Sequence, residues 1–144
     1  MVHLEPITED NWRTSLCVSE AQQKYVSDSA HLLARAYAYR EQRSCACMIY
    51  NDDTPVGMAL YYDCPELDAY DFSQLFIDSR YQGKGYGRQA AALILDRMRA
   101  ERKFPKVLLC YVLGNDTAKS MYERLGFRHT GDDDDDEIAM ELAL

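Results

Sequence analysis

The residues best suited to chemistry begin with a glycine-rich segment, which reads Arg-Tyr-Gln-Gly-Lys-Gly-Tyr-Gly-Arg from Arg80 to Arg88. It stands between an apolar strand-like run and a helical pattern that starts near Gly87, so three glycines lie where a strand becomes a helix. Glycine lets the main chain curl and approach a ligand closely, and the first turn of the following helix adds unpaired N–H donors and the positive end of its dipole. The segment therefore predicts a phosphate-binding turn.

The spacing of the glycines separates three kinds of phosphate-binding loop. A P-loop needs four residues between its glycines and then Gly-Lys-Ser/Thr, which this chain lacks, and a dinucleotide loop needs glycine where Arg88 stands. The segment instead fits Gln/Arg-x-x-Gly-x-Gly, with Gln82, Gly85 and Gly87 in register. The alternative is a glycine-rich connection that binds nothing.

A second motif follows one helix and one strand later. It reads Asn-Asp-Thr-Ala-Lys-Ser-Met-Tyr-Glu-Arg-Leu-Gly-Phe from Asn115 to Phe127. The first motif resembles the pyrophosphate loop of the GNAT superfamily of acyl-CoA-dependent N-acetyltransferases, and the second matches every specified position of that family's Asn-x-x-Ala-x-x-x-Tyr-x-x-x-Gly-Phe pattern. The resemblance implies one GNAT domain over residues 1–144, an α/β (α+β) fold whose mixed, mostly antiparallel central sheet of about six to seven strands is flanked by about four helices.

The resemblance also implies where acetyl-CoA, the acyl donor, would bind. In that family the strand before the loop splays from the next strand, here 107–112, and the pantetheine arm enters the gap. Tyr122 would lie near the thioester sulfur, Asn115 would hydrogen-bond the pantetheine, and Lys119 is a weaker candidate for phosphate contact. The other cofactor-binding residues assigned by the resemblance are Leu75, Phe76, Ile77, Gln82, Gly83, Lys84, Gly85, Tyr86, Gly87 and Arg88.

The phenol of Tyr122 suits the leaving group of acetyl transfer. The reaction expels CoA as a thiolate, and a nearby phenol can donate a hydrogen bond or a proton to it. With a thiol pKa of ~8.5 and a tyrosine pKa of ~10, full proton transfer is uphill by roughly 2 kcal/mol, so stabilising the thiolate counts as much as protonating it. The alternative is that Tyr122 is one more core aromatic among the chain's 11 tyrosines.

The acceptor amine arrives as an ammonium ion and must lose a proton before it attacks. A nearby carboxylate can bind the cation and accept that proton, directly or through water. The candidates lie before or on the strand that leads to the glycine loop: Glu41, Asp63, Glu66, Asp68 and Asp71. Each is alternatively a surface charge.

The stretch from Phe76 to Gly85, with Cys64-Pro65-Glu66 upstream, resembles the spermine/spermidine acetyltransferase branch of bacterial GNAT enzymes. That branch often has an acidic residue three positions before its Phe-Ile-Asp; here Ser73 occupies the position and Asp71 is the nearest carboxylate. The resemblance implies direct attack of a primary amine, foremost a polyamine or diamine, on acetyl-CoA in a ternary complex. The alternatives are an antibiotic amine, a protein N-terminus, or a CoA-binding sensor without turnover.

The composition limits the class of protein. A chain of 144 residues with 47% hydrophobic residues suits one domain with one substantial core. Neither a membrane span nor a signal peptide is visible, so we expect a cytoplasmic protein without a membrane partner. The net charge of −8 argues against nucleic-acid binding, and it favours cationic partners or simply solubility.

The cysteines and histidines predict no metal site. The five cysteines form no C-x-x-C pair and predict reduced thiols, with Cys45 and Cys47 facing one side of a strand. The three histidines are scattered along the chain. For assembly, a homodimer is the default expectation.

The hydrophobic pattern predicts the elements that must position these residues. We expect strands over 2–7, 43–50, 56–62, 69–78, 106–113, 127–130 and 138–142, and helices over 8–18, 20–40, 87–102 and 116–124. Residues 107–112 of the 106–113 strand form an apolar run, as expected of a strand buried on both faces. The acidic run Asp132–Asp136 predicts a solvated turn.

Overall fold

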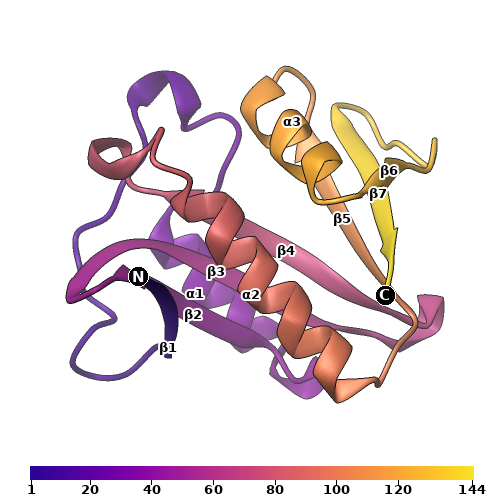
Figure 1. Ribbon diagram of the computed structural model, residues 1–144, viewed down its shortest axis with the longest axis horizontal. Coiled ribbons are helices and arrows are strands. Elements are labelled where there is room, and N and C mark those ends of the chain that lie inside the picture. The colour runs from indigo at the N-terminus through magenta and orange to yellow at the C-terminus, as the bar shows by residue number, and fades with distance from the viewer.

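Seven strands form one sheet in the order β1-β2-β3-β4-β5-β7-β6 in the computed structural model, which describes residues 1–144 (Figure 1). All neighbouring strands are antiparallel except β4 and β5, which run parallel. The strands are β1 Val2–Pro6, β2 Cys45–Asn51, β3 Thr54–Cys64, β4 Ala69–Ile77, β5 Lys106–Val112, β6 Arg128–His129 and β7 Glu137–Ala143. The mixed, mostly antiparallel sheet and every predicted strand are confirmed.

Helices cover the two faces of the sheet unequally. Helix α2, Tyr86–Glu101, crosses one face in the foreground of Figure 1 and buries Ala90, Ala91, Ile94, Leu95 and Met98 in the larger core cluster. Helix α1, Ser29–Ala38, lies on the opposite face against β2 and β3, where its Leu32 is fully buried. Helix α3, Asp116–Arg124, lies beside β5. None of these helices combines the length and apolarity needed to cross a bilayer.

The helix predicted over 8–18 is wrong, and the one predicted over 20–40 is too long. Side chains in the first segment bond to nearby main chain instead: Thr8 N–H donates to Asn11 Oδ1 at 2.8 Å, and Asn11 Nδ2 donates to the Pro6 carbonyl at 2.9 Å. Such local bonds compete with helix formation. The second helix begins only at Ser29, where Asp28 Oδ1 accepts from His31 N–H at 2.8 Å. The sheet is therefore flanked by three α-helices rather than about four.

Strand β5 is not buried on both faces as predicted. Val107, Leu109 and Tyr111 are buried under the larger core, whereas Cys110, which alternates with them, is exposed. The apolar residues of the second face instead line a cleft, described below. An apolar sequence alone does not tell core from the wall of a binding site.

Candidate active site

A cleft of about 1140 Å³ opens where β4 and β5 part. The two strands are aligned only at Tyr70 with Val107 and at Asp71 with Leu108, and beyond these pairs they diverge. The β4 edge past Asp71 therefore has no strand partner on this side, and its main-chain groups are available to a ligand. The gap between these strands, implied by the GNAT resemblance, is present.

Tyr122 lines this cleft from α3. Its ring packs edge-on against Phe72 of β4, with centroids 6.2 Å apart, and against Phe127, with centroids 5.6 Å apart. The C-terminal turn of α3 fixes its backbone, because Phe127 N–H donates to the Tyr122 carbonyl at 3.0 Å and Gly126 takes the left-handed conformation that this turn requires. Asn115 begins the same helix, and its Oδ1 accepts from Ala118 N–H at 3.3 Å.

The Tyr122 hydroxyl is directed toward the cleft rather than tied to the core. Only 7% of the residue is exposed, yet its hydroxyl makes no hydrogen bond within the protein and is not among fully enclosed polar atoms. Burial of the ring raises the pKa of the phenol above its ordinary value. At neutral pH Tyr122 is therefore a protonated donor with a free O–H.

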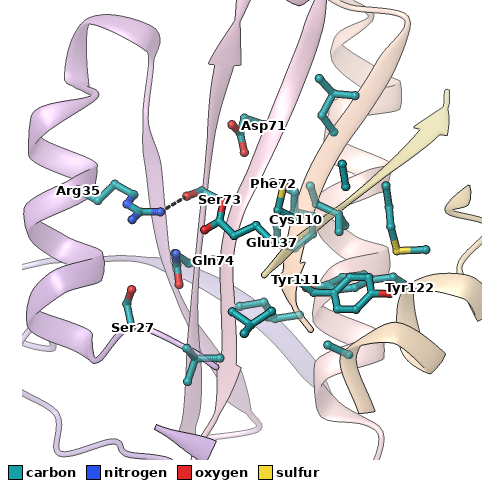
Figure 2. A pocket seen from close by; sticks show the side chains of 18 of the residues that line it. Ser27, Arg35, Asp71, Phe72, Ser73, Gln74, Cys110, Tyr111, Tyr122 and Glu137 are labelled. Carbon is teal, nitrogen blue, oxygen red and sulfur yellow. Dashed lines mark hydrogen bonds between the residues drawn. The ribbon is translucent and has the colours of Figure 1, made fainter. Parts of the chain in front are cut away.

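The opposite wall holds polar groups on the α1 side of the sheet. Arg35 of α1 donates to Ser73 Oγ at 3.2 Å (Figure 2). The Tyr62 hydroxyl lies 3.4 Å from the same oxygen. The ring of Tyr39 stacks on Tyr62 with centroids 4.2 Å apart. Asp71 lines the same cleft, and the charge of Arg35 acts on its carboxyl group.

Asp71 is the only one of the five predicted carboxylates that lines the cleft. It makes neither a hydrogen bond nor an ion pair within the protein, although it lies at the narrow end of the cleft where β4 and β5 separate. Burial raises the pKa of Asp71 to about 6; the charge of Arg35 opposes that rise and Glu137 of β7 adds to it. A carboxyl group with a pKa near neutrality suits the acceptance of a proton from an incoming cation.

The glycine-rich turn presents a row of free main-chain donors. Gly83 and Gly85 have positive φ angles of 77° and 83°, and no N–H group from Gln82 to Gly85 donates to an acceptor in the protein. The first main-chain bond of α2 runs from Gln89 N–H to the Gly85 carbonyl at 3.1 Å, which leaves the first-turn donors free as well. The turn lies outside the cleft lining and continues from the C-terminal end of β4.

Side-chain hydrogen bonds hold this turn in place and leave its main-chain donors free. Gln82 Nε2 donates to the Ile77 carbonyl at 2.8 Å. Asp78, which is 1% exposed, accepts from Arg80 and from Cys17 N–H, and the Arg80 contact lowers the pKa of Asp78 to about 2. Lys84 and Arg88 are exposed and form no ion pair, so cationic side chains flank the free donors. The arrangement suits a diphosphate.

Several predicted site residues lie outside the cleft. Asp63 pairs with Arg43 at 2.7 Å and with Lys103 at 2.8 Å. Glu41, Glu66 and Asp68 are exposed and do not line the cleft, and neither does Lys119 on α3. The side chains of Phe76 and Ile77 pack into the cores, so only their main chain is available to a ligand, whereas Leu75 lines the cleft.

Sequence reasoning missed Arg35, Tyr62 and Glu137 as residues of the cleft. They come from α1, β3 and β7, so only the tertiary fold brings them together. Arg35 carried a weak signal, since it is a lone cation in the middle of an alanine-rich helix. No signal distinguished Glu137 from the acidic run before it.

Known proteins resemble this chain over almost its full length. The model of the acetyltransferase (GNAT) family matches residues 5–127. The spermine/spermidine N(1)-acetyltransferase of Bacillus subtilis strain 168 is 27% identical over 139 residues, which cover 91% of this chain and 90% of that protein. The spermidine N-acetyltransferase from Vibrio cholerae, solved in complex with CoA and spermine, has a TM-score of 0.79 at 17% identity, covering 99% of this chain and 95% of that one. An acetyltransferase from Thermus thermophilus has a TM-score of 0.78 at 21% identity, covering 99% of this chain and 97% of that one.

Proposed function

This chain belongs to the GNAT acetyltransferase family and is an acetyl-CoA-dependent N-acetyltransferase, and from that premise we propose that its acceptor is a polyamine or diamine. The Bacillus relative and the Vibrio structure are named for such acceptors, which supports the proposal. The unpartnered carboxylate of Asp71 in the cleft is the observation that carries it, because that group can bind a cationic amine.

Different parts of the chain would hold different parts of acetyl-CoA. The free N–H groups of the glycine-rich turn would hold the diphosphate of CoA, and the unpaired edge of β4 would accompany the pantetheine arm. Asn115 would contact the pantetheine from the start of α3. Acetyl-CoA supplies the activated acyl group, which the cleft would present to the amine.

Asp71 would accept a proton from the amine, and Tyr122 would stabilise the leaving thiolate. Asp71 would bind the ammonium and accept its proton, directly or through water, which produces the neutral amine that attacks the acyl carbon. As the N–C bond forms and the C–S bond breaks, a proton of the attacking nitrogen would pass to the CoA sulfur, directly or through water. The Tyr122 hydroxyl would donate a hydrogen bond to that departing thiolate, since the raised pKa of this phenol keeps it protonated. Ser73, held by Arg35, would line the α1 side of the cleft near Asp71.

The acceptor is tested by measuring free-thiol release from acetyl-CoA over a panel of spermidine, spermine, a short diamine, an aminoglycoside and a peptide with a free N-terminus. Turnover of the polyamines with kcat/KM at least about tenfold above that of the peptide is the expected result, because each extra ammonium adds charge complementary to the carboxylates of the cleft. Preference for the peptide or the aminoglycoside would reject the proposed acceptor and leave the acetyltransferase assignment intact.

A further inference from the structure

A thiol pair lies outside the machinery of acetyl transfer. Cys45 and Cys47 alternate on β2 and face the same side, as predicted, with their Sγ atoms 3.6 Å apart. Arg97 of α2 reaches over them, and its Nη1 lies 3.7 Å from Cys47 Sγ. Tyr61 of β3 stands directly opposite Cys45 in the sheet register. Two converging thiols beside a guanidinium and a phenol form a chemically distinct cluster.

The two thiols are unlike in exposure and in acidity. Cys45 is half-buried and reachable from solvent, whereas Cys47 is 1% exposed. The contact with the Cys47 sulfur lowers the pKa of Cys45 to about 6, and the Tyr61 hydroxyl and the Arg97 charge act in the same direction against burial. The same interaction and burial raise the pKa of Cys47. The reachable sulfur of Cys45 is therefore the more acidic of the two thiols.

We propose that Cys45 and Cys47 form a covalent modification site for hydroperoxides, in which Cys45 is the attacking thiol and Cys47 the resolving thiol. The Cys45 thiolate attacks one peroxide oxygen, so an S–O bond forms and the O–O bond breaks. With hydrogen peroxide the departing hydroxide takes a proton and leaves as water, and with an organic hydroperoxide the departing alkoxide leaves as the alcohol. The Cys47 sulfur then attacks the sulfur of the Cys45 sulfenic acid, an S–S bond forms, and the S–O bond breaks with release of water. Two electrons pass from the thiols to the peroxide.

The geometry makes this disulfide easily reversed. Alternate residues of a strand lie about 6.4–6.8 Å apart, which is the upper end of the Cα separation that a disulfide spans. Closing the bond toward the usual Cα separation of about 5.5–6 Å therefore shortens β2 locally. Strained disulfides have more oxidising potentials and are the labile, regulatory ones. Ordinary cellular thiols would reduce the pair and restore the strand.

A line of neighbours connects the thiol pair with the cleft. Cys45 pairs with Tyr61 across β2 and β3, and Tyr61 pairs with Phe72 across β3 and β4. The Phe72 ring packs against Tyr122 with centroids 6.2 Å apart. Shortening β2 at Cys45 moves Tyr61 and the ring behind the phenol, so we expect oxidation to slow acetyl transfer. This consequence rests on the proposed role of Tyr122, whereas the thiol chemistry does not.

Intact-protein mass spectrometry after treatment with equimolar hydrogen peroxide tests the site. The expected product has lost the mass of two hydrogen atoms, and peptide mapping places the link between Cys45 and Cys47. In Cys47→Ser, a cyclic diketone captures the sulfenic acid at Cys45. In Arg97→Gln, oxidation is roughly tenfold slower because the stabilising cation is gone. Cys110→Ser serves as the matched control and reacts like the wild type, although Cys110 is the more exposed thiol.

Two results would overturn the proposal. Oxidation of Cys17 or Cys110 before Cys45 would mean that exposure alone governs reactivity. Equal thiol loss in Cys45→Ser and the wild type would remove Cys45 from the attacking role. Unchanged thiol release from acetyl-CoA in the fully linked protein, before and after dithiothreitol, would overturn only the expected effect on acetyl transfer. If the protein turned over no amine, the proposed function would be wrong. The mass change after peroxide treatment would still show whether Cys45 and Cys47 form the disulfide.

Discussion

The two halves of the sheet meet at β4 and differ in how closely their backbones are joined. On one side β4 is aligned with β3 over eight residue pairs, from Gly57 with Ile77 to Cys64 with Ala69. On the other side it is aligned with β5 over two pairs. The closed half, β1 to β4, has helices on both faces, and the open half, β5 to β7, leaves one face to the cleft. Where β4 and β5 diverge, their main-chain N–H and C=O groups have no partner strand and are therefore available to a ligand.

This difference separates stability from chemistry. The closed half holds Ile49, Met58 and Leu60 at 0% exposure, whereas the side chains that would act on the substrates line the cleft between β4 and β5. Free main-chain groups cost stability when they are buried without partners, so a cleft for a cofactor needs a scaffold that is stable without it. We therefore expect some substitutions to lower the stability of the fold and others to lower the rate of acetyl transfer.

The largest expected effect is a loss of stability in the closed half. Ile49→Ala deletes a fully buried side chain of β2 and should lower the free energy of unfolding by about 3 kcal/mol, because a cavity adds to the lost burial. Ile138→Ala makes the same change in the open half, where the residue is only half-buried, and should cost about 1 kcal/mol. Urea denaturation compares the two variants. Equal losses would contradict the contrast between the halves.

Tyr122→Phe should slow the reaction without loosening the cofactor. Removal of a hydroxyl that donates to the leaving thiolate should lower kcat about 100-fold, and the acetyl-CoA Kd should stay within about twofold. Steady-state thiol release gives the first quantity and calorimetric titration with CoA gives the second. Tyr111→Phe is the matched control, since its hydroxyl bonds to His129 at 2.8 Å rather than to a reacting group. Parallel losses of kcat and affinity would argue against the proposed role.

Asp71→Asn should lower kcat/KM for spermidine about 30-fold, because the variant neither attracts the ammonium nor accepts its proton. The pKa of Asp71 is raised to about 6, so the acid is protonated and inactive below that pH. For the wild type kcat/KM should therefore rise as the pH increases through about 6, and the variant should lack this limb. Asp68→Asn, an exposed carboxylate outside the cleft, controls for net charge. A limb near pH 6 that persists in Asp71→Asn would assign it to another group.

The sequence predicted what depends on local spacing. The glycine positions, the Asn115-to-Phe127 pattern and the 43–62 hairpin each follow from neighbours along the chain, and all are present. The helix over 8–18 failed because polar side chains compete for the main chain, which periodicity does not record. Among the carboxylates, Asp63 and Asp71 looked alike in sequence. The strand register and the divergence of β4 from β5 distinguish them. Asp63 forms ion pairs with Arg43 and Lys103, whereas Asp71 lines the cleft.

The smallest expected effect tests whether the glycine-rich turn uses its free donors. Gly85 and Gly131 both have φ angles of 83°, and an added Cβ has ample room at each position. Alanine at either position should therefore strain the backbone by a similar ~1 kcal/mol. Only Gly85→Ala displaces the N–H groups that begin α2, so it should weaken CoA binding about tenfold while Gly131→Ala leaves binding unchanged. If both variants bind CoA equally well by calorimetric titration, the glycine-rich turn does not hold the diphosphate, and CoA is bound by the residues that line the cleft alone.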